Sequence, residues 1–228
     1  MLSPLTCAHV RQVDRDAVTD LGLPSLLLME NAAYGVFNAI QRDGPWTTIT
    51  ILAGPGNNGG DGLAVARLLA AHGVDAVVFL VRAGKQLSGD AASNLAFLKN
   101  SGVVVTEASP EEIQKRIESL SSFDLIVDAL LGTGIRGMVA TPFIEIIQFI
   151  NKSSARILAV DVPSGLDCDR GIPCGHCVSA HTTVTFVAQK KGFLADTAMQ
   201  FLGRVEVCPI GIPQGWLEKW QARMNAVL

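Results

Sequence analysis

The chain has 228 residues, of which 49% are hydrophobic and 17% charged, so it is long and apolar enough to bury a sizeable core. Its formal net charge of −3 argues against a nucleic-acid-binding surface, which would need clustered basic residues. No apolar run approaches the roughly 18 residues of a membrane-spanning helix, and the first residues lack the basic and apolar regions of a signal peptide. We therefore expect a cytoplasmic protein with neither nucleic acid nor membrane as a partner.

Two helices are predicted before the first strand, at about residues 6–20 and 25–42, with Gly-Leu-Pro between them. The second helix is apolar almost all round, so it should be well buried. Glu30 and Asn31 then need partners inside an apolar environment. They are either hydrogen-bonded structural groups or part of the wall of an active site.

Seven short apolar, β-branched runs predict strands, and helical patterns alternate with them. Continuous apolar strands indicate burial on both faces, and the alternation predicts a mostly parallel sheet with helices on both sides. No repeat or charged tract marks a second domain, so residues 1–228 form a single α/β domain with a core over 47–212 and a closing helix over 213–228. The strands are expected at 47–54, 76–81, 103–108, 124–131, 155–163, 183–188 and 204–211, and the helices between them at 59–72, 87–100, 110–119 and 141–151.

The chain contains five cysteines, an odd number that does not indicate a disulfide framework in a chain with a good core. Cys168, Cys174 and Cys177 cluster in CDRGIPCGHC, but one Cys-x-x-Cys pair falls short of the two that a structural zinc site usually has. We expect these cysteines to be reduced thiols in a surface loop.

Three of the predicted strands run into unusual segments: GPGNNGGDG after the first, DALLGTGIRG at the fourth and DVPSGLD at the fifth. Because parallel strands place their carboxyl ends at the same edge of a sheet, these segments should meet where ligands bind. Glycines allow close approach of the backbone, and the N–H groups of a following helix favour phosphate oxygens. The two glycine-rich segments therefore suit a pyrophosphate or a ribose phosphate, although Gly-x-Gly-x-x-Gly alone is weak evidence.

The first segment differs from the fingerprint of hydride-transfer enzymes. Such enzymes place an acidic residue roughly 20 residues further on for the ribose hydroxyls, whereas here the second strand is followed by Arg82 and Lys85. A single carboxylate such as Asp61 could merely complement the dipole of a first helical turn. Its repetition at Asp128 and Asp161 along the same edge makes that explanation insufficient.

Several acidic and amide side chains at one edge need a positive partner. Oxygen ligands suit a hard cation, either a monovalent ion or magnesium together with phosphates. In the alternative, the aspartates accept hydrogen bonds from backbone N–H groups and bind no metal.

Five segments resemble, in the same order, the NAD(P)H-hydrate epimerases of the YjeF N-terminal domain family. They are VRQVDRDAVTDLGLPSLLLMENAA, AGPGNNGGDGLAVARLL, DALLGTGIRG, VDVPSGLD and VTFVAQKKGF, and the resemblance spans roughly residues 6–212. It implies a three-layer αβα sandwich with a Rossmann-like, mostly parallel sheet, and a homodimer. It also implies interconversion of the R and S forms of hydrated NADH and NADPH (NADHX and NADPHX), after which a separate NAD(P)H-hydrate dehydratase restores the cofactor.

The resemblance also implies roles for individual residues. A potassium ion would be bound by Asn58, Asp128 and Ser164, and QKKGF is similar to the lysine–glycine segment of the family, with Lys190 a better match than Lys191. Substrate contacts would come from Asn57, Asn58, Gly59, Gly60, Asp61, Gly132, Thr133, Gly134, Ile135, Arg136, Gly137, Met138 and Asp161.

The implied reaction concerns a carbon next to the ring nitrogen. Its hydroxyl can leave to give an iminium to which water returns on the other face, or the ring can open and reclose. Either route needs an acid–base group within hydrogen-bond reach, for which Asp161 is the first candidate and Asp61 the second.

Two other functions are compatible with this fold. An NADP-dependent oxidoreductase is disfavoured because no Tyr-x-x-x-Lys pair is present and Tyr34 is the only tyrosine. A non-catalytic binding module would be expected to have lost the polar segments, whereas all three are intact.

Overall fold

In the computed structural model, which describes residues 2–135 and 137–226, seven parallel strands form one sheet. The strand order is β3-β2-β1-β4-β5-β6-β7, so the chain reverses direction across the sheet between β1 and β4. In such sheets the crevice at this reversal is where ligands bind. The strands are β1 (Ile49–Ala53), β2 (Val77–Leu80), β3 (Val105–Glu107), β4 (Leu125–Ala129), β5 (Arg156–Val160), β6 (Thr182–Phe186) and β7 (Arg204–Cys208).

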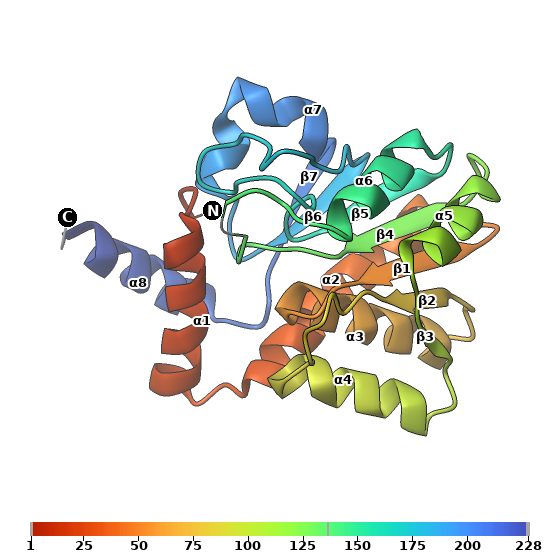
Figure 1. Ribbon diagram of the computed structural model, residues 1–228. Helices are drawn as coiled ribbons and strands as arrows, with labels where there is room; N and C mark the ends of the chain where they lie inside the picture. The colour runs from red at the N-terminus through yellow and green to blue at the C-terminus, as the bar shows by residue number, and fades with distance from the viewer. Residues whose placement is uncertain (1, 136, 227–228) are drawn as a thin grey trace.

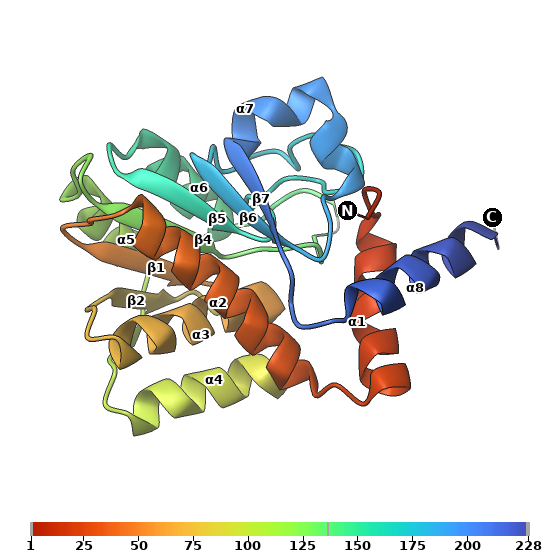
Figure 2. The ribbon, with the colours of Figure 1, turned by 180° about the vertical axis from the view of Figure 1, so that it is seen from behind.

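Helices cover both faces of the sheet and make three layers (Figures 1 and 2). One layer holds α2 (Ser25–Asp43), α3 (Asn57–Ala71) and α4 (Gly89–Asn100), and the other holds α5 (Pro110–Glu118) and α6 (Phe143–Lys152). The two hydrophobic cores lie on opposite sides of the central strands: Ile51 of β1 packs in the first core and Leu52 in the second. The predicted αβα sandwich is therefore confirmed.

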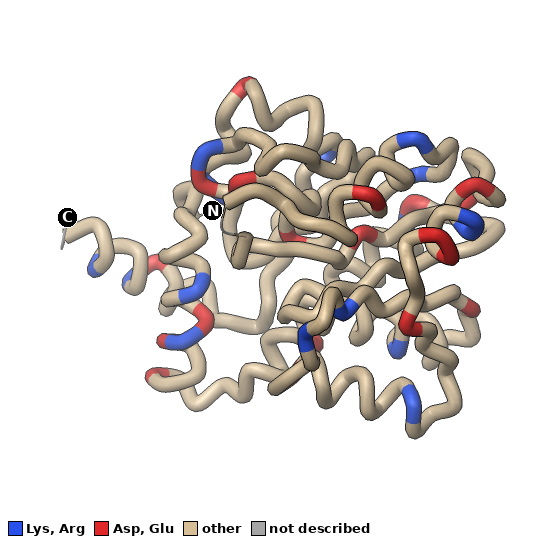
Figure 3. The backbone as a smooth tube through the Cα atoms, in the orientation of Figure 1, with Lys and Arg blue, Asp and Glu red and all other residues tan. Residues whose placement is uncertain are grey.

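Helices α1 (Cys7–Leu21) and α8 (Gln214–Ala226) lie side by side away from the sheet layers (Figures 1 and 2). Trp220 of α8 joins them, since it is 1% exposed, contacts His9 edge-on and donates a hydrogen bond from Nε1 to Asp16 at 2.7 Å. Acidic and basic residues alternate along these helices and over the rest of the described chain (Figure 3).

The predicted strands and helices are all present, with ends displaced by a few residues. The sequence did not predict the short helical segments η1 (Lys191–Leu194), η2 (Asp196–Ala198) and α7 (Met199–Leu202), which are too brief to show a helical period. Helix α5 begins with the Ser109–Glu112 capping box, which stabilises its first turn. In the described part of the chain, none of the helices has the length and apolar character needed to cross a membrane.

Glu30 and Asn31 have a structural role. Glu30 forms an ion pair with Arg67 of α3, and Asn31 donates a hydrogen bond to the Leu27 carbonyl at 3.0 Å. Neither side chain lines the large cavity described below. The structural alternative is therefore confirmed for both.

The expectation of reduced surface thiols is wrong for Cys168. Cys168 and Cys7 form a disulfide with a Cα–Cα distance of 6.3 Å, and Cys177 is buried although its thiol is free. The sequence carries no local signal for this pair because 161 residues separate its members, which meet only when the start of α1 reaches the loop after β5. The cysteines thus give no support to a reducing compartment.

Candidate functional site

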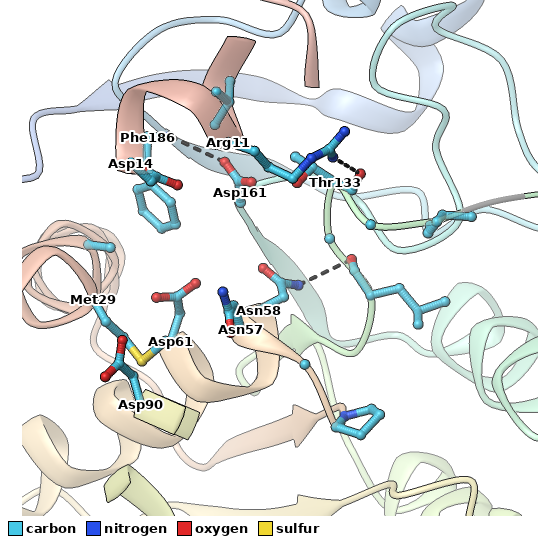
Figure 4. Close-up of a pocket in the computed structure, with 18 of the residues that line it drawn as sticks. Arg11, Asp14, Met29, Asn57, Asn58, Asp61, Asp90, Thr133, Asp161 and Phe186 are labelled. Atoms are coloured by element: carbon cyan, nitrogen blue, oxygen red, sulfur yellow. Dashed lines mark hydrogen bonds between the residues drawn. The ribbon is translucent and has the colours of Figure 1, made fainter. Parts of the chain in front are cut away.

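A cavity of about 1040 Å³ lies over the carboxyl ends of the central strands, at the reversal between β1 and β4 (Figure 4). Helix α1 closes it on one side, and the first turns of α3 form another side. This volume is at the upper end of the range of small-molecule sites. The three polar segments singled out in the sequence all contribute to its walls.

The first segment forms the start of α3 rather than a loop. The helix begins at Asn57, so Asp61 lies in its second turn and the explanation from the dipole of the first turn is wrong for it. The Asn57, Asn58 and Asp61 side chains line the cavity (Figure 4). The backbone N–H groups of the first helical turn face the same end and favour phosphate oxygens.

The glycines of this segment allow close packing. A Cβ atom on Gly59 would lie 1.9 Å from the Gly54 carbonyl oxygen, and one on Gly54 would lie 1.8 Å from the Leu130 carbonyl oxygen. A Cβ atom on Gly60 would lie 2.8 Å from Met29 Cε. Gly59 and Gly60 are therefore packed against neighbouring elements and lie outside the cavity lining, which they shape by holding α3 close to the sheet.

The second segment follows β4 and forms the wall opposite the first. Gly132, Thr133, Gly134, Ile135 and Met138 line the cavity, Gly137 does not, and Arg136 is outside the described residues. Arg11 of α1 donates a hydrogen bond from Nη1 to the Thr133 carbonyl at 2.9 Å, which ties this segment to the helix above it (Figure 4).

Asn58, Asp128 and Ser164 come together beneath the cavity. Asp128 and Ser164 are fully buried, and Asp128 accepts hydrogen bonds from the Ser164 hydroxyl at 2.6 Å and from its N–H group at 2.8 Å. Asn58 donates to the Leu131 carbonyl at 3.1 Å, while its Oδ1 is buried without a hydrogen-bond partner among the described residues. An orphaned amide oxygen beside a buried carboxylate and a hydroxyl is a donor set that suits a hard cation.

Asp161 follows β5 and has a backbone φ of 62°, in the left-handed region that non-glycine residues seldom adopt. Its carboxylate forms an ion pair with Lys190 at 2.7 Å and accepts a hydrogen bond from the Thr185 hydroxyl at 3.1 Å. Lys190 is fully buried and also donates to the Phe186 carbonyl at 3.1 Å. Backbone strain of this kind concentrates at functional sites.

Two further carboxyl groups face the same space (Figure 4). Asp14 of α1 has its pKa raised to about 6, first by burial and then by the nearby Asp161 charge, while Lys190 and Arg15 act in the opposite direction. Asp61 is 9% exposed, and its pKa is raised well above its usual value, again chiefly by burial and then by Asp161 and Asp14. In Figure 4, Asp14 and Asp161 enter the cavity from one side and Asp61, Asn57 and Asn58 from the other.

Sequence reasoning did not assign Asp14 or Arg11 to the site, and it left Lys190 without a role. The QKKGF segment gave a signal for Lys190. Asp14 and Arg11 gave none, because polar residues on one side of an amphipathic helix normally face solvent.

A sequence model of the family described as "YjeF-related protein N-terminus" matches residues 25–192. The chain is 38% identical over 213 residues to the "NAD(P)H-hydrate epimerase" of Pirellula staleyi, covering 93% of this chain and 94% of the relative. It is 39% identical over 215 residues to the "Bifunctional NAD(P)H-hydrate repair enzyme Nnr" of Moorella thermoacetica, covering 92% of this chain but only 41% of that longer relative.

The crystal structure of yeast ynu0 has a similar fold. It superposes with a TM-score of 0.79 at 23% sequence identity, covering 96% of this chain and 93% of the yeast chain. At this identity the likeness supports the fold alone.

Proposed function

Because the chain belongs to the family of YjeF-related protein N-termini, we propose that it is an NAD(P)H-hydrate epimerase that interconverts the R and S forms of NADHX and NADPHX. The observation that carries the proposal is the meeting of Asp14, Asp61, Asp90 and Asp161 in one cavity at the sheet reversal, with the buried Lys190 paired to Asp161. Relatives that are epimerases by name and match along nearly their whole length support the same reaction.

The cavity offers suitable partners for a dinucleotide. Besides its acidic groups, the N-terminus of α3 and the basic residues Arg15 and Lys85 contribute to its lining. We expect the phosphates to bind at the helix N-terminus and the basic side chains, which leaves the hydrated nicotinamide ring for the carboxyl groups.

The reaction needs a proton donor and a proton acceptor. The hydroxyl of the hydrated carbon leaves as water when it receives a proton, and the ring becomes an iminium. Water then adds to the opposite face and gives up a proton, so atoms and charge balance over the cycle. Asp161 is our first candidate for an acid–base group because its carboxylate is held by Lys190 inside the cavity. Asp61 is the second.

We further propose that a potassium ion is held by the Asn58 Oδ1, the Asp128 carboxylate and the Ser164 hydroxyl. The orphaned Asn58 oxygen supports this assignment, and a bound monovalent cation would supply fixed positive charge beneath the phosphates. Asn58 and Ser164 also hold the three polar segments together, because each forms a hydrogen bond with Leu131 of the second segment.

The assembly of the protein and its place in repair are also proposals. The bifunctional relatives combine repair activities in one longer chain, so we propose that a separate dehydratase consumes the epimer made here. We propose a homodimer from the resemblance to the family, and light scattering of the purified chain tests it: a monomer at micromolar concentration contradicts it.

The function is tested by adding the purified chain to a single epimer of NADPHX and following both epimers by NMR or chiral-phase chromatography. We expect the approach to the R/S equilibrium to accelerate in proportion to enzyme concentration, after subtraction of the spontaneous reaction. An unchanged rate contradicts the proposal. Oxidation of NADPH in the presence of a panel of carbonyl compounds would instead favour the oxidoreductase alternative.

A further inference from the structure

Asp14 is the one cavity carboxyl group that α1 contributes, and the proposed reaction gives it no role of its own. It lies three residues after Arg11, which holds α1 against the second glycine-rich segment through Thr133. Among the described residues, no side chain forms a hydrogen bond or an ion pair with the Asp14 carboxyl group. It is therefore free to bind a ligand, unlike Asp161, whose carboxylate is already paired with Lys190.

We propose that Asp14 is a second proton-transfer residue of the epimerase and that the hydrated ring binds edge-on between Asp14 and Asp161, so that each carboxyl group faces one face of the ring. Asp14 donates a proton to the departing hydroxyl, and Asp161 accepts one from the returning water. The proposal rests on the proposed function. In the reverse direction the two residues exchange roles, and transfer of the proton from Asp161 back to Asp14 resets the enzyme. Each cycle breaks one C–O bond, forms one C–O bond and returns both carboxyl groups to their initial states.

The surroundings of the two groups differ. Asp161 accepts a hydrogen bond from the Thr185 hydroxyl and forms an ion pair with Lys190. Asp14 has no such partner among the described residues, and burial and the Asp161 charge raise its pKa to about 6. Two carboxyl groups with environments of this kind are a recurring arrangement for acid and base.

Asp61 is less suited to proton transfer than Asp14. It is 9% exposed and lies near Asp161, Asp14 and Asp90, all of which disfavour its ionised form. A buried carboxyl group whose ionised form is disfavoured can donate a hydrogen bond to the substrate, and this is the role we assign to Asp61. Asp14, with a pKa of about 6, is matched to the release and the return of a proton near neutral pH.

The test compares the wild type with Asp14→Asn, which keeps the shape of the side chain but cannot transfer a proton. Asp20→Asn is the matched control, because Asp20 is an exposed residue of the same helix, outside the cavity, with a 3.8 Å ion pair to Arg223 and a hydrogen bond from the neighbouring Thr19 hydroxyl at 3.2 Å. We expect Asp14→Asn to lower kcat about 100-fold or more, the usual size of an acid–base contribution, with the affinity for NADPH changed less than about threefold. Asp20→Asn should match the wild type.

A pH profile separates proton transfer from a structural role. For the wild type, kcat/KM should fall as the pH rises through about 6, because the free enzyme must hold its proton on Asp14, and Asp14→Asn should lack this decline. The charged groups that act on Asp14, and so set the pH of this decline, are Asp161, Lys190, Arg15 and Asp61. Asp14→Glu, which retains a carboxyl group, should regain part of the lost kcat.

The proposal is overturned if Asp14→Asn keeps kcat within about twofold of the wild type, or if it keeps the same decline with pH. It is also overturned if Asp14→Glu is no more active than Asp14→Asn while both bind NADPH normally. A wild-type chain without any epimerase activity contradicts the proposed function itself. An active wild type with an equally active Asp14→Asn variant contradicts only the role of Asp14.

Discussion

The two polar regions around the cavity differ in how their charges are satisfied. In the first, beneath the cavity, Asp128 is bonded through both oxygens to Ser164, and one atom, Asn58 Oδ1, is without a partner. In the second, in the cavity wall, Lys190 forms an ion pair with Asp161, whereas Asp14 has no ion-pair partner among the described residues. The first region is built on the central strands, and the second depends on α1, which lies outside the sheet layers.

This contrast separates two kinds of chemistry. In the first region, the Asp128 carboxylate is fixed by several hydrogen-bond donors, and the Asn58 amide oxygen is unpaired. Oxygen atoms held in this way are suited to binding an ion. In the second region the Asp161 charge raises the pKa of Asp14, and a cavity carboxyl group tuned in this way is suited to moving protons. Changes in the second region should therefore affect turnover, whereas changes in the first should affect ion binding and stability.

The largest expected effect is that of Asp161→Asn on turnover. The substitution removes a proton acceptor and leaves Lys190 buried without its counter-ion, so we expect kcat to fall about 10²- to 10⁴-fold. Loss of one partner of a buried pair should also destabilise the fold by about 3–5 kcal/mol. Steady-state kinetics and denaturant unfolding measure the two effects, and near-normal kcat in the folded variant would contradict a proton-transfer role for Asp161.

Sequence patterns predicted the sheet and its helices well because the strands are buried on both faces and alternate with amphipathic segments. They also brought Asn58, Asp128 and Ser164 to one edge, since each lies just after or within a parallel strand. The features that the sequence did not predict depend on tertiary contacts. Nothing local shows that Asp14 faces a cavity rather than solvent, and nothing links Cys7 to Cys168 across 161 residues.

The disulfide gives the next largest effect and tests whether the second region depends on the position of α1. Cys7→Ser together with Cys168→Ser should lower the free energy of unfolding by about 2–4 kcal/mol, because the bond closes a long loop of the unfolded chain. The start of α1 would then be held by the hydrogen bond from the Cys7 N–H group to Asp169 and by the backbone hydrogen bonds of Leu5 with Gln189 and Lys191.

Turnover should fall in this double variant, whereas ion binding in the first region should stay unchanged. Denaturant unfolding under non-reducing conditions measures the stability, and the wild type with added dithiothreitol is the chemical control. Equal stability of the wild type and the variant would contradict a bond that holds α1 in place.

Potassium should stabilise the first region by a smaller amount. Replacing sodium chloride with potassium chloride at constant ionic strength should raise the free energy of unfolding by about 1–3 kcal/mol, as expected for ligand at about 10 to 100 times its Kd. Asn58→Leu should abolish the difference because it removes the orphaned oxygen, while the neighbouring Asn57→Leu should retain it. An equal response of all three proteins would contradict the assigned site.

The smallest expected effect is the change in the free energy of unfolding when one aspartate in each region is replaced by asparagine. The sign of this change should differ between the two regions. The pKa of Asp14 is about 6 in the folded protein, against a usual value near 3.8, so the folded protein holds a proton that the unfolded chain releases between these values. The contribution of Asp14 to the free energy of unfolding of the wild type is therefore lost as the pH rises from about 4 to 6. Asp14→Asn avoids that loss and should be about 1–2 kcal/mol more stable than the wild type at pH 8, after allowance for partial solvent exposure, with no gain below about pH 4.

Asp128→Asn should do the opposite at pH 8. Burial raises the pKa of Asp128 to about 6 as well, so the amide also removes the cost of a buried charge at pH 8. Its N–H₂ would however face a Ser164 donor in place of one oxygen, which leaves two buried donors unpaired, so the fold should still be destabilised by about 1–3 kcal/mol. Urea unfolding of both variants at pH 4 and pH 8 measures the difference. A stability change of the same sign for both variants would show that the two regions are not distinct. A group that moves a proton and a group that holds its neighbours in place should respond in opposite directions to the same isosteric substitution.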